Sequence, residues 1–326
     1  MTRSEAIPNI SARALTDASH KDHTATLEKV ASAVDDIGFL TVSDTGISAA
    51  DIDSLLATYK QFFLGSADNK SAVDMALTGS NRGWGSAGAE QVNTNANPDY
   101  KQVFDCGPEL AAYDPLAQYS YYAPNLWPAE PEGFREVITS YYQRATAVAQ
   151  LLLSALAKSI GEPHDYFDDK FDKPMSLLRG NYYPPRPRNA TDKDFGIAAH
   201  SDYGCLTLLA TDGTPGLEVL SKSNEWLPVT PEPGVFVINF GEMLEMWTNG
   251  RVVATLHRVV GGTKERLSVP LFFNPRYDVN VAPSGSAETI PAGEHLARRY
   301  DETYIHRKKA MPAQTPVGIN VKSTDA

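Results

Sequence analysis

The stretch GIAAHSDYGCLTLLATD, residues 196–212, is the part of the sequence that decides the fold assignment. It begins like a buried strand, yet it carries an imidazole and a carboxylate, His200 and Asp202, two positions apart. Positions i and i+2 of an extended chain point to the same face, so the two side chains project together. A dry core strand does not favour this pair, because an unpaired buried carboxylate is costly. The pair therefore either lies at the wet mouth of a sheet or binds a ligand.

The sequence around this stretch indicates a mainly β fold with flanking helices. From residue 175 onward, short apolar runs recur about every ten residues, with Pro, Gly, Asp and Asn in the gaps. This spacing is typical of a sandwich, a jelly roll or a barrel. The expected strands are 176–183, 205–210, 216–220, 226–229, 235–240, 255–260 and 268–274.

Helical patterns precede and follow these strands. Apolar residues at helical spacing predict one long helix near 132–160, which Gly161 and Pro163 would end. Ser48 is a candidate N-cap for an earlier helix. Further helical segments are expected around 27–34, 242–247 and 292–308.

The chain is expected to form one compact structural unit with recognisable parts. Residues 1–130 would form an N-terminal α/β region that packs on the core. Residues 131–312 would supply the long helix, the β core and a C-terminal helix, and residues 313–326 a polar tail. Residues 79–130 are rich in Gly, Asn and Ser and are too long for a simple connection, which favours a functional loop.

Composition excludes several classes of function. A net charge of −11 gives the chain no electrostatic attraction to nucleic acid or to an anionic membrane. The sequence contains no run of about 18 apolar residues, the length that a helix needs to span a bilayer, and the N-terminus lacks a signal-peptide core. The two cysteines, Cys106 and Cys205, form no disulfide framework, which favours a reducing compartment. We expect a cytoplasmic monomer.

The pair His200 and Asp202 needs a third partner to be a convincing metal site, because the same His-x-Asp pattern recurs at His20 and Asp22 in a polar stretch. His257 is the candidate, in the apolar run VVATLHRVVGG. Alone, such a histidine is more often a satisfied core residue. Two histidines and one aspartate on neighbouring strands, however, leave three coordination positions open, which suits non-haem Fe(II) and O₂ chemistry.

A candidate site for a carboxylate follows His257 along the chain. Arg266 and Ser268 share one face of a strand, and a guanidinium with a hydroxyl can clamp a carboxylate. The alternative is an internal salt bridge, since a buried arginine must be paired.

Three polar residues that alternate along another strand suggest a second wall of the same site. Arg179, Asn181 and Tyr183 face one way and could line a polar ligand. The alternative is an edge strand whose polar face is solvated.

At these residues the sequence resembles the 2-oxoglutarate/Fe(II)-dependent dioxygenases of the isopenicillin N synthase-like family. The resemblance covers nearly the whole chain, in order and spacing. The motifs that carry it are NRGWGSAGAE, PDYKQVFDCG, NYYPP, HSDYGCLTLL, VINFGEMLEMWTNG, ATLHRVV and RLSVPLFFNP. The resemblance implies a distorted double-stranded β-helix, or jelly roll, as the core.

The resemblance also implies a set of ligands and of residues that bind them. His200, Asp202 and His257 would be the iron ligands. Arg266 and Ser268 would hold the distal carboxylate of 2-oxoglutarate, which Asn181 and Tyr183 would help to seat. The cofactors implied are Fe(II), 2-oxoglutarate and O₂, with ascorbate as a candidate reductant. The reaction implied is oxidation of a small organic metabolite, as in secondary metabolism, with release of succinate and CO₂.

The substrate contacts are the least specific part of this interpretation. Phe272 and Asn274 lie on the strand face of Ser268 and match positions that line the substrate site in the family. Phe104, or Trp84, could form an apolar wall. These aromatic residues could equally be ordinary core residues.

Arg179 gives the sharpest hypothesis about the substrate. An inward-facing cation needs an anion or a strong acceptor, which suggests a substrate with a carboxylate, enolate or phenolate. The alternative is a salt bridge to an acid of the preceding loop, such as Glu90 or Asp105.

Other functions remain open from sequence. Relatives on the same fold include Fe(II) oxidases that do not use 2-oxoglutarate, and some of these keep the Arg-x-Ser pair. A metal-free binding protein on the same barrel is the third candidate. The chain has Asp44 and Thr45 where the family often has Asn-His, and Gln102 where it often has glutamate. These departures concern the substrate class, which the sequence does not identify.

Overall fold

The computed structural model describes residues 7–93, 95–186, 188–191 and 193–303, which form two β-sheets with helices around them. The strands of the large sheet run in the order β1-β2-β10-β7-β12-β5-β4-β3, and those of the small sheet in the order β6-β11-β8-β9. Strand bounds are β1 Asn9–Ser11, β2 Phe39–Ser43, β3 Gly83–Gly85, β4 Gln102–Cys106, β5 Leu177–Tyr183, β6 Ile197–His200, β7 Leu206–Thr211, β8 Leu217–Leu220, β9 Trp226–Pro228, β10 Phe236–Phe240, β11 His257–Val259 and β12 Arg266–Phe273. The α-helices are α1 Ala12–Thr16, α2 His23–Asp36, α3 Ala49–Phe63, α4 Ala67–Ser71, α5 Phe134–Ser159, α6 Glu242–Trp247 and α7 Ala292–Thr303.

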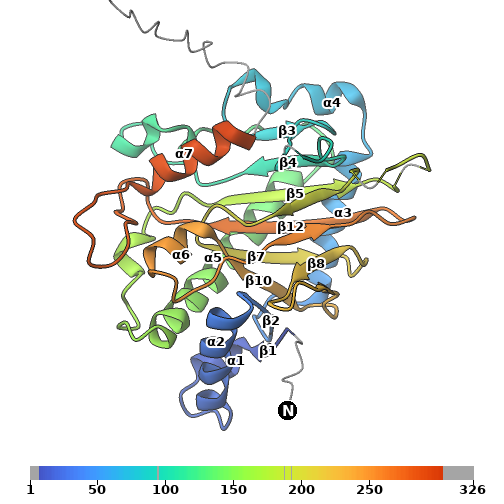
Figure 1. The fold of residues 1–326 in the computed structure, drawn as a ribbon. Coiled ribbons are helices and arrows are strands. Elements are labelled where there is room, and N and C mark those ends of the chain that lie inside the picture. The colour runs from blue at the N-terminus through green and yellow to red at the C-terminus, as the bar shows by residue number, and fades with distance from the viewer. Residues whose placement is uncertain (1–6, 94, 187, 192, 304–326) are drawn as a thin grey trace, which may run out of the picture.

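The expected elements are present within about two residues at most ends. Each strand expected after residue 175 is found, and the long helix is α5 (Figure 1). Ser48 caps α3, as predicted, and the structure adds a capping box with Asp51. The end of the last expected helix, 304–308, and the polar tail, 313–326, lie outside the described residues.

The large sheet has α5 and α3 on one face and the small sheet on the other. The two helices contact β7 and β12, and α5 crosses behind the sheet in Figure 1. On the opposite face, apolar side chains from both sheets form one buried cluster. Strand β5 is buried along its whole length because it is covered on both faces. Polar side chains also lie in the space between the two sheets, and their burial there needs an explanation.

Candidate active site

One pocket opens between the two sheets and contains most of the residues singled out in the sequence. Its walls come from β5, β7 and β12 of the large sheet and from β6, β8 and β11 of the small one. The loop before β4, helix α7, the turn after β6, Phe39 of β2 and Asn239 of β10 also contribute to the lining.

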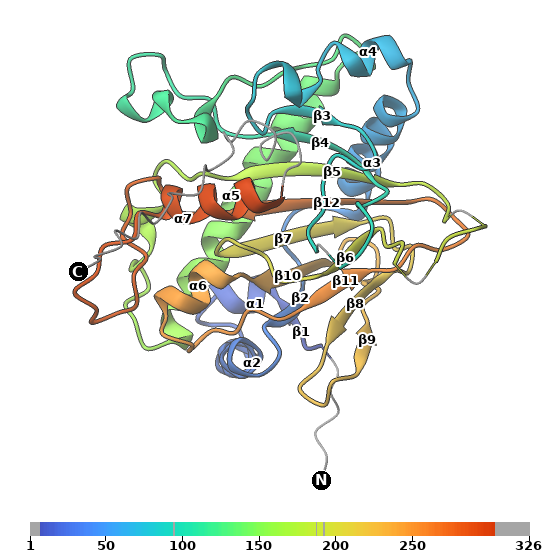
Figure 2. The same cartoon turned by 45° about the horizontal axis from the view of Figure 1, so that its top comes forward.

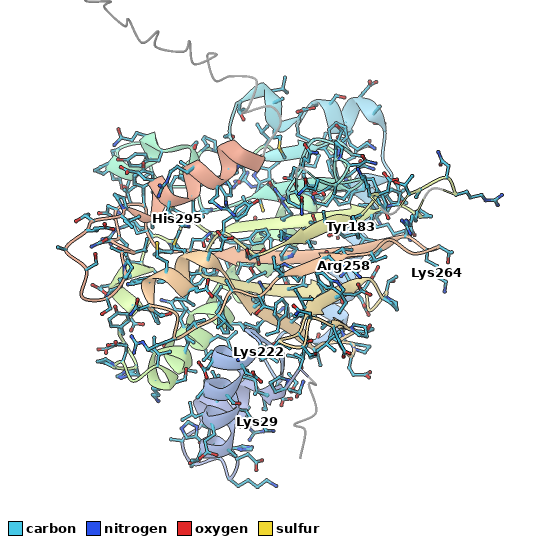
Figure 3. The ribbon with its side chains drawn as sticks, viewed as in Figure 1. Lys29, Tyr183, Lys222, Arg258, Lys264 and His295 are labelled. Atoms are coloured by element: carbon cyan, nitrogen blue, oxygen red, sulfur yellow. The ribbon has the colours of Figure 1, made fainter. Side chains whose placement is uncertain are left out.

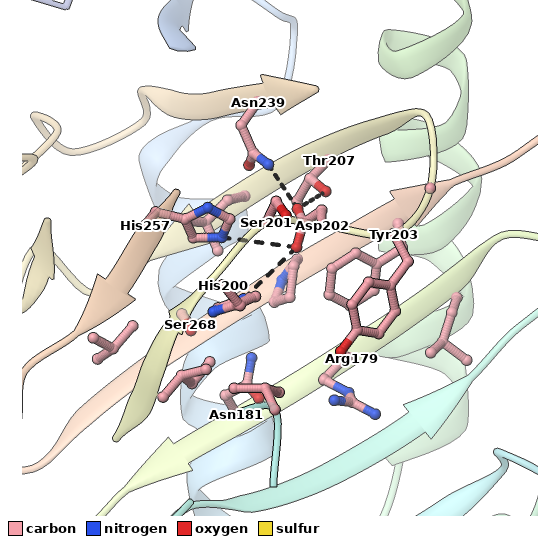
Figure 4. Close-up of a pocket in the computed structure, with 18 of the residues that line it drawn as sticks. Arg179, Asn181, His200, Ser201, Asp202, Tyr203, Thr207, Asn239, His257 and Ser268 are labelled. Carbon is pink, nitrogen blue, oxygen red and sulfur yellow. Dashed lines mark hydrogen bonds and ion pairs between the residues drawn. The ribbon is translucent and has the colours of Figure 1, made fainter. Parts of the chain in front are cut away.

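His200, Asp202 and His257 meet in this pocket (Figure 4). His200 ends β6 and His257 begins β11, and the two are direct partners in the antiparallel pair, with ring centroids 4.4 Å apart. Asp202 follows β6, and its Oδ1 lies 3.9 Å from Nε2 of His200 and 3.7 Å from Nε2 of His257. The possible ligand atoms all lie within 4.8 Å of one another, so they could hold one ion.

Backbone carbonyls orient both imidazoles. Nδ1 of His200 lies 2.8 Å from the carbonyl of Ala198, and Nδ1 of His257 lies 3.0 Å from that of Thr255. A carbonyl only accepts, so each Nδ1 carries a proton, and in the neutral ring Nε2 then keeps its lone pair for a ligand. Metal-binding histidines are oriented by such hydrogen bonds.

Two side chains hold the far oxygen of Asp202. Thr207 Oγ1 and Asn239 Nδ2 donate to Oδ2 at 2.5 and 2.6 Å, which turns Oδ1 toward the histidines (Figure 4). Burial alone would raise the pKa of Asp202, but the neighbouring histidines and these hydrogen bonds lower it. Burial and the nearby His257 lower the pKa of His200. A neutral imidazole and an ionised carboxylate form the donor set that Fe(II) prefers.

Arg266 provides a binding position for an anion in the same pocket. The residue is only 5 % exposed, and its Nε donates to the carbonyl of Thr214 at 3.2 Å. Its Nη1 is buried without a hydrogen-bond partner, and no carboxylate among the described residues forms an ion pair with it. The guanidinium lies 5.2 Å over the ring of Tyr183. Because a buried cation without an anion is costly, the site fits a ligand carboxylate rather than the internal salt bridge that was the alternative.

Strands β5 and β12 bring the other candidate cosubstrate residues to Arg266. Their register pairs Arg266 with Tyr183 and Ser268 with Asn181. The amide oxygen of Asn181 is also buried without a partner. Strand β5 lies between β12 and β4, so the alternative of a solvated edge strand is wrong. Tyr183 lies at the opposite end of the sheet from His295 on α7 (Figure 3).

Comparison with known proteins agrees with this geometry. A model described as the 2OG-Fe(II) oxygenase superfamily matches residues 174–275, and the model of the non-haem dioxygenase N-terminal region in morphine synthesis matches 7–130. The chain is 31 % identical over 312 residues to the 2-oxoglutarate-dependent dioxygenase tropC of Talaromyces stipitatus, covering 92 % of this chain and 96 % of tropC. The chain belongs to the 2-oxoglutarate/Fe(II) oxygenase superfamily.

Solved structures of related proteins support the fold assignment of this oxygenase. A 2OG-Fe(II) oxygenase family protein from Caulobacter crescentus is 29 % identical, with a TM-score of 0.79 over 92 % of this chain and 99 % of the other. A full-length Neurospora crassa protein, solved in complex with alpha-KG, is 25 % identical, with a TM-score of 0.78 over 90 % of this chain and 95 % of the other. The predicted jelly-roll core is confirmed, and the enzyme uses Fe(II), 2-oxoglutarate and O₂. No helix in the described part of the chain is long and apolar enough to cross a membrane.

The hypothesis that Arg179 of the oxygenase meets an anionic substrate assumed that its guanidinium needs an anion from the ligand, and this premise is wrong. Its Nε and Nη2 donate to the two carboxylate oxygens of Asp105 at 2.7 and 2.6 Å, and its Nη1 donates to Glu90 Oε2 at 3.0 Å. The alternative, a salt bridge to the preceding loop, is what the structure has. Glu90 is shared with Lys101, which also pairs with Asp99. The alternation along β5 predicted the direction of Arg179 correctly but could not predict its partners.

The prediction that Phe104 forms a wall of the pocket is also wrong. Phe104 is fully buried on the other side of β4, with ring centroids 5.0 Å from both Phe62 and Phe134. Trp84 does not reach the pocket either, and its Nε1 donates to Gln102. The loop before β4 does line the pocket, through Glu90, Val92 and Lys101.

The pocket contains some of the residues that the sequence predicted as substrate contacts and others that it did not predict. Phe272 and Asn274 both line the pocket, although Oδ1 of Asn274 accepts from the backbone N–H of Cys205 at 2.9 Å. Leu296 and Tyr300 of α7 were not anticipated. They are apolar and aromatic positions on one helix stripe, and sequence periodicity does not distinguish a stripe that faces a cavity from one that faces a core.

Proposed function

We propose that His200, Asp202 and His257 bind Fe(II), that Arg266 holds the distal carboxylate of 2-oxoglutarate, and that a small organic substrate binds toward α7. Ser268, Asn181 and Tyr183 surround the same cosubstrate position. The observation that carries the proposal is the buried guanidinium of Arg266 in the pocket of the triad, whose Nη1 has no hydrogen-bond partner and which forms no ion pair with a carboxylate of the described residues. A buried cation of this kind binds a dicarboxylate end-on in a fixed orientation.

The chain's own residues would orient the reactants and exclude water. With Fe(II), 2-oxoglutarate and O₂ bound, such a centre supplies the oxidant for a substrate C–H bond, and 2-oxoglutarate is cleaved to succinate and CO₂. The neutral imidazoles and the fixed carboxylate oxygen of Asp202 would hold the metal on one side only, which leaves the other side to the reactants. Arg266 would fix the cosubstrate at the far end.

The side chains of β5 and β12 that line the pocket favour a substrate without a negative charge. Along β5 and β12 the side chains change from Arg266 and Tyr183 at one end to Phe272 and Leu177 at the other, which are also register partners. The other Lys and Arg side chains that line the pocket in the described residues, Arg179 and Lys101, are already paired with carboxylates. A neutral, cyclic or aromatic metabolite fits this lining better than a carboxylate does. The morphine-synthesis description of the matching N-terminal model supports a role in secondary metabolism.

The test is turnover of the purified enzyme with Fe(II), 2-oxoglutarate and O₂. A panel of small neutral aromatic and alicyclic metabolites, each matched with its carboxylated analogue, is screened for stimulated release of succinate. Stimulation by neutral compounds supports the proposal, and stimulation by the carboxylated analogues alone overturns the substrate class. O₂ uptake with substrate but without 2-oxoglutarate would favour an oxidase, and failure to bind Fe(II) would favour a binding protein.

Two further expectations accompany this function. We infer a cytoplasmic enzyme, because Cys106 and Cys205 are free and buried, as in proteins of reducing compartments. We also infer a monomer, which sedimentation velocity would test at several concentrations.

A further inference from the structure

Residues 201–205, here called the ligand turn, connect β6 to β7 and carry Asp202. The first backbone N–H groups of α6 hold this turn. Glu242 N donates to the carbonyl of Asp202 at 2.8 Å, and Met243 N donates to that of Gly204 at 3.1 Å. The approach is close, because a Cβ on Gly241 would lie 2.6 Å from the Asp202 carbonyl oxygen. The position of Asp202 therefore depends on where α6 lies.

The side chain of Glu242 connects the ligand turn to a second element. Its Oε1 accepts from Ser201 Oγ at 2.6 Å, and Ser201 lies between His200 and Asp202 in the sequence. The same Oε1 accepts from Arg299 Nη2 of α7 at 3.0 Å. One carboxylate oxygen thus joins the ligand turn to α7. Figure 2 shows α6 and α7 at the same end of the large sheet.

Helix α7 is itself a wall of the pocket. Leu296 and Tyr300 line the cavity that contains His200 and Asp202. Arg299, between them on the helix, lies 4.5 Å over the ring of Tyr203, which belongs to the ligand turn. A substrate that packs against α7 and a metal that binds Asp202 would therefore act on two elements joined at Glu242.

We propose that Glu242 is a positioning residue that couples the closure of α7 over the substrate to the position of the ligand turn at the metal. The inference rests on the proposed function, in which Asp202 binds the metal and the α7 end receives the substrate. Coupling between two sites is reciprocal, so metal binding must stabilise α7 to the same extent as α7 stabilises metal binding. Glu242 and Arg299 are 28 % and 34 % exposed, so solvent screens the pair and the coupling is modest.

The experiment measures this coupling without turnover and without knowledge of the substrate. Amide hydrogen exchange of α7, residues 293–303, is followed in metal-stripped enzyme and after addition of Mn(II) and 2-oxoglutarate. In the wild type the addition should slow exchange in α7 by about two- to fivefold. In Glu242→Ala the ratio of the α7 exchange rates without and with metal should fall to about one, and Mn(II) should bind more weakly by the factor that is lost.

Control variants separate coupling from a purely structural role. Glu245 lies one turn further along α6, and its Oε1 accepts from the backbone N–H of Ala254. Glu245→Ala should keep the wild-type ratio of exchange rates without and with metal. In Arg299→Met, as in Glu242→Ala, the addition of metal should no longer slow exchange in α7. In Arg298→Met, whose side chain is on the exposed side of α7, the metal should slow exchange as in the wild type. In the double variant of Glu242 and Arg299 the effects should not add.

The outcomes distinguish the two proposals. If Glu242→Ala speeds exchange in α7 equally with and without metal, its role is structural and the coupling is overturned. If the wild type binds no Mn(II), as judged by unchanged exchange of residues 197–206 and unchanged Tm, the proposed metal site itself fails.

Discussion

His200 and His257 face each other directly across the antiparallel pair of β6 and β11, with their ring centroids 4.4 Å apart. Strand register therefore fixes the relative position of the two imidazoles, and their Nδ1 atoms are tied to the backbone of the same strands and their flanks. The geometry of the site does not depend on a flexible loop for these two groups. Only Asp202, on the turn after β6, needs additional support.

Substitution of the triad should remove metal binding. We expect His257→Ala and Asp202→Ala each to abolish succinate release and to weaken Fe(II) binding, because two protein ligands alone hold the ion poorly. His20→Ala is the matched control, since His20 and Asp22 repeat the His-x-Asp pattern on the surface, away from the pocket. Equilibrium dialysis against Fe(II) under anaerobic conditions measures the effect. Full metal content in His257→Ala would remove that residue from the site.

The side chains that hold Asp202 in place should affect metal affinity almost as much as Asp202 itself. Asn239→Ala removes one of the two side-chain donors to Oδ2 and frees the carboxylate to rotate. Loss of such a contact is expected to lower metal affinity by about 10–100-fold. Asn9→Ala, which breaks an exposed bond to Thr41, should leave affinity unchanged. Chelator competition with Mn(II) gives both values, and equal affinities for the two variants would contradict the argument.

Much of the site could be predicted because it is built from strands with a period of two. The i, i+2 rule oriented Arg266 with Ser268 on β12. It also predicted that Asp202 lies beside His200, although Asp202 is on the turn after β6, and the structure has each pair in one pocket. The core strands after residue 175 are short and bounded by turn residues, so their positions could be predicted from the sequence to within about two residues.

Partners far apart in the sequence could not be predicted in the same way. The direction of Arg179 was correct, but its partner Asp105 lies on β4, in a region interpreted as a loop. Without the strand assignment, the facing direction of Phe104 was also undetermined, and it points into the aromatic core between β4, α3 and α5. Pairing across strands depends on register, which local pattern does not encode for an unrecognised strand.

Loss of the Arg266 guanidinium should act on cosubstrate binding. Arg266→Ala removes the only cation at that end of the pocket among the described residues, apart from the paired Lys101. A buried pair of this kind contributes about 2–5 kcal/mol, so the KM for 2-oxoglutarate should rise by at least about thirtyfold. Lys264→Ala, exposed on the preceding turn, should have no effect. Steady-state succinate release at varied 2-oxoglutarate measures this, and an unchanged KM would place the cosubstrate elsewhere.

Arg179 should act on stability rather than on recognition of a substrate charge. Arg179→Met leaves Asp105, which is fully buried, and Glu90 without their guanidinium. Breaking a buried pair from one side costs about 3–5 kcal/mol. Arg144→Met removes an ion pair to Asp51 that is about 40 % exposed on both sides, and should cost less than about 1 kcal/mol. Urea unfolding of both variants gives the comparison.

The pH dependence of unfolding provides an independent check of the same network. Burial alone would raise the pKa of Glu90, but Arg179 and Lys101 overcome this and lower it from 4.5 to about 2. A carboxyl whose pKa is depressed on folding stabilises fully above the unfolded value and loses that contribution as pH falls toward the folded value. The part of the wild-type advantage over Arg179→Met that comes from Glu90 should therefore shrink between about pH 4.5 and pH 2. An Arg179→Met enzyme of wild-type stability, with a raised KM for carboxylated substrates, would restore the role in substrate binding that the salt bridges argue against.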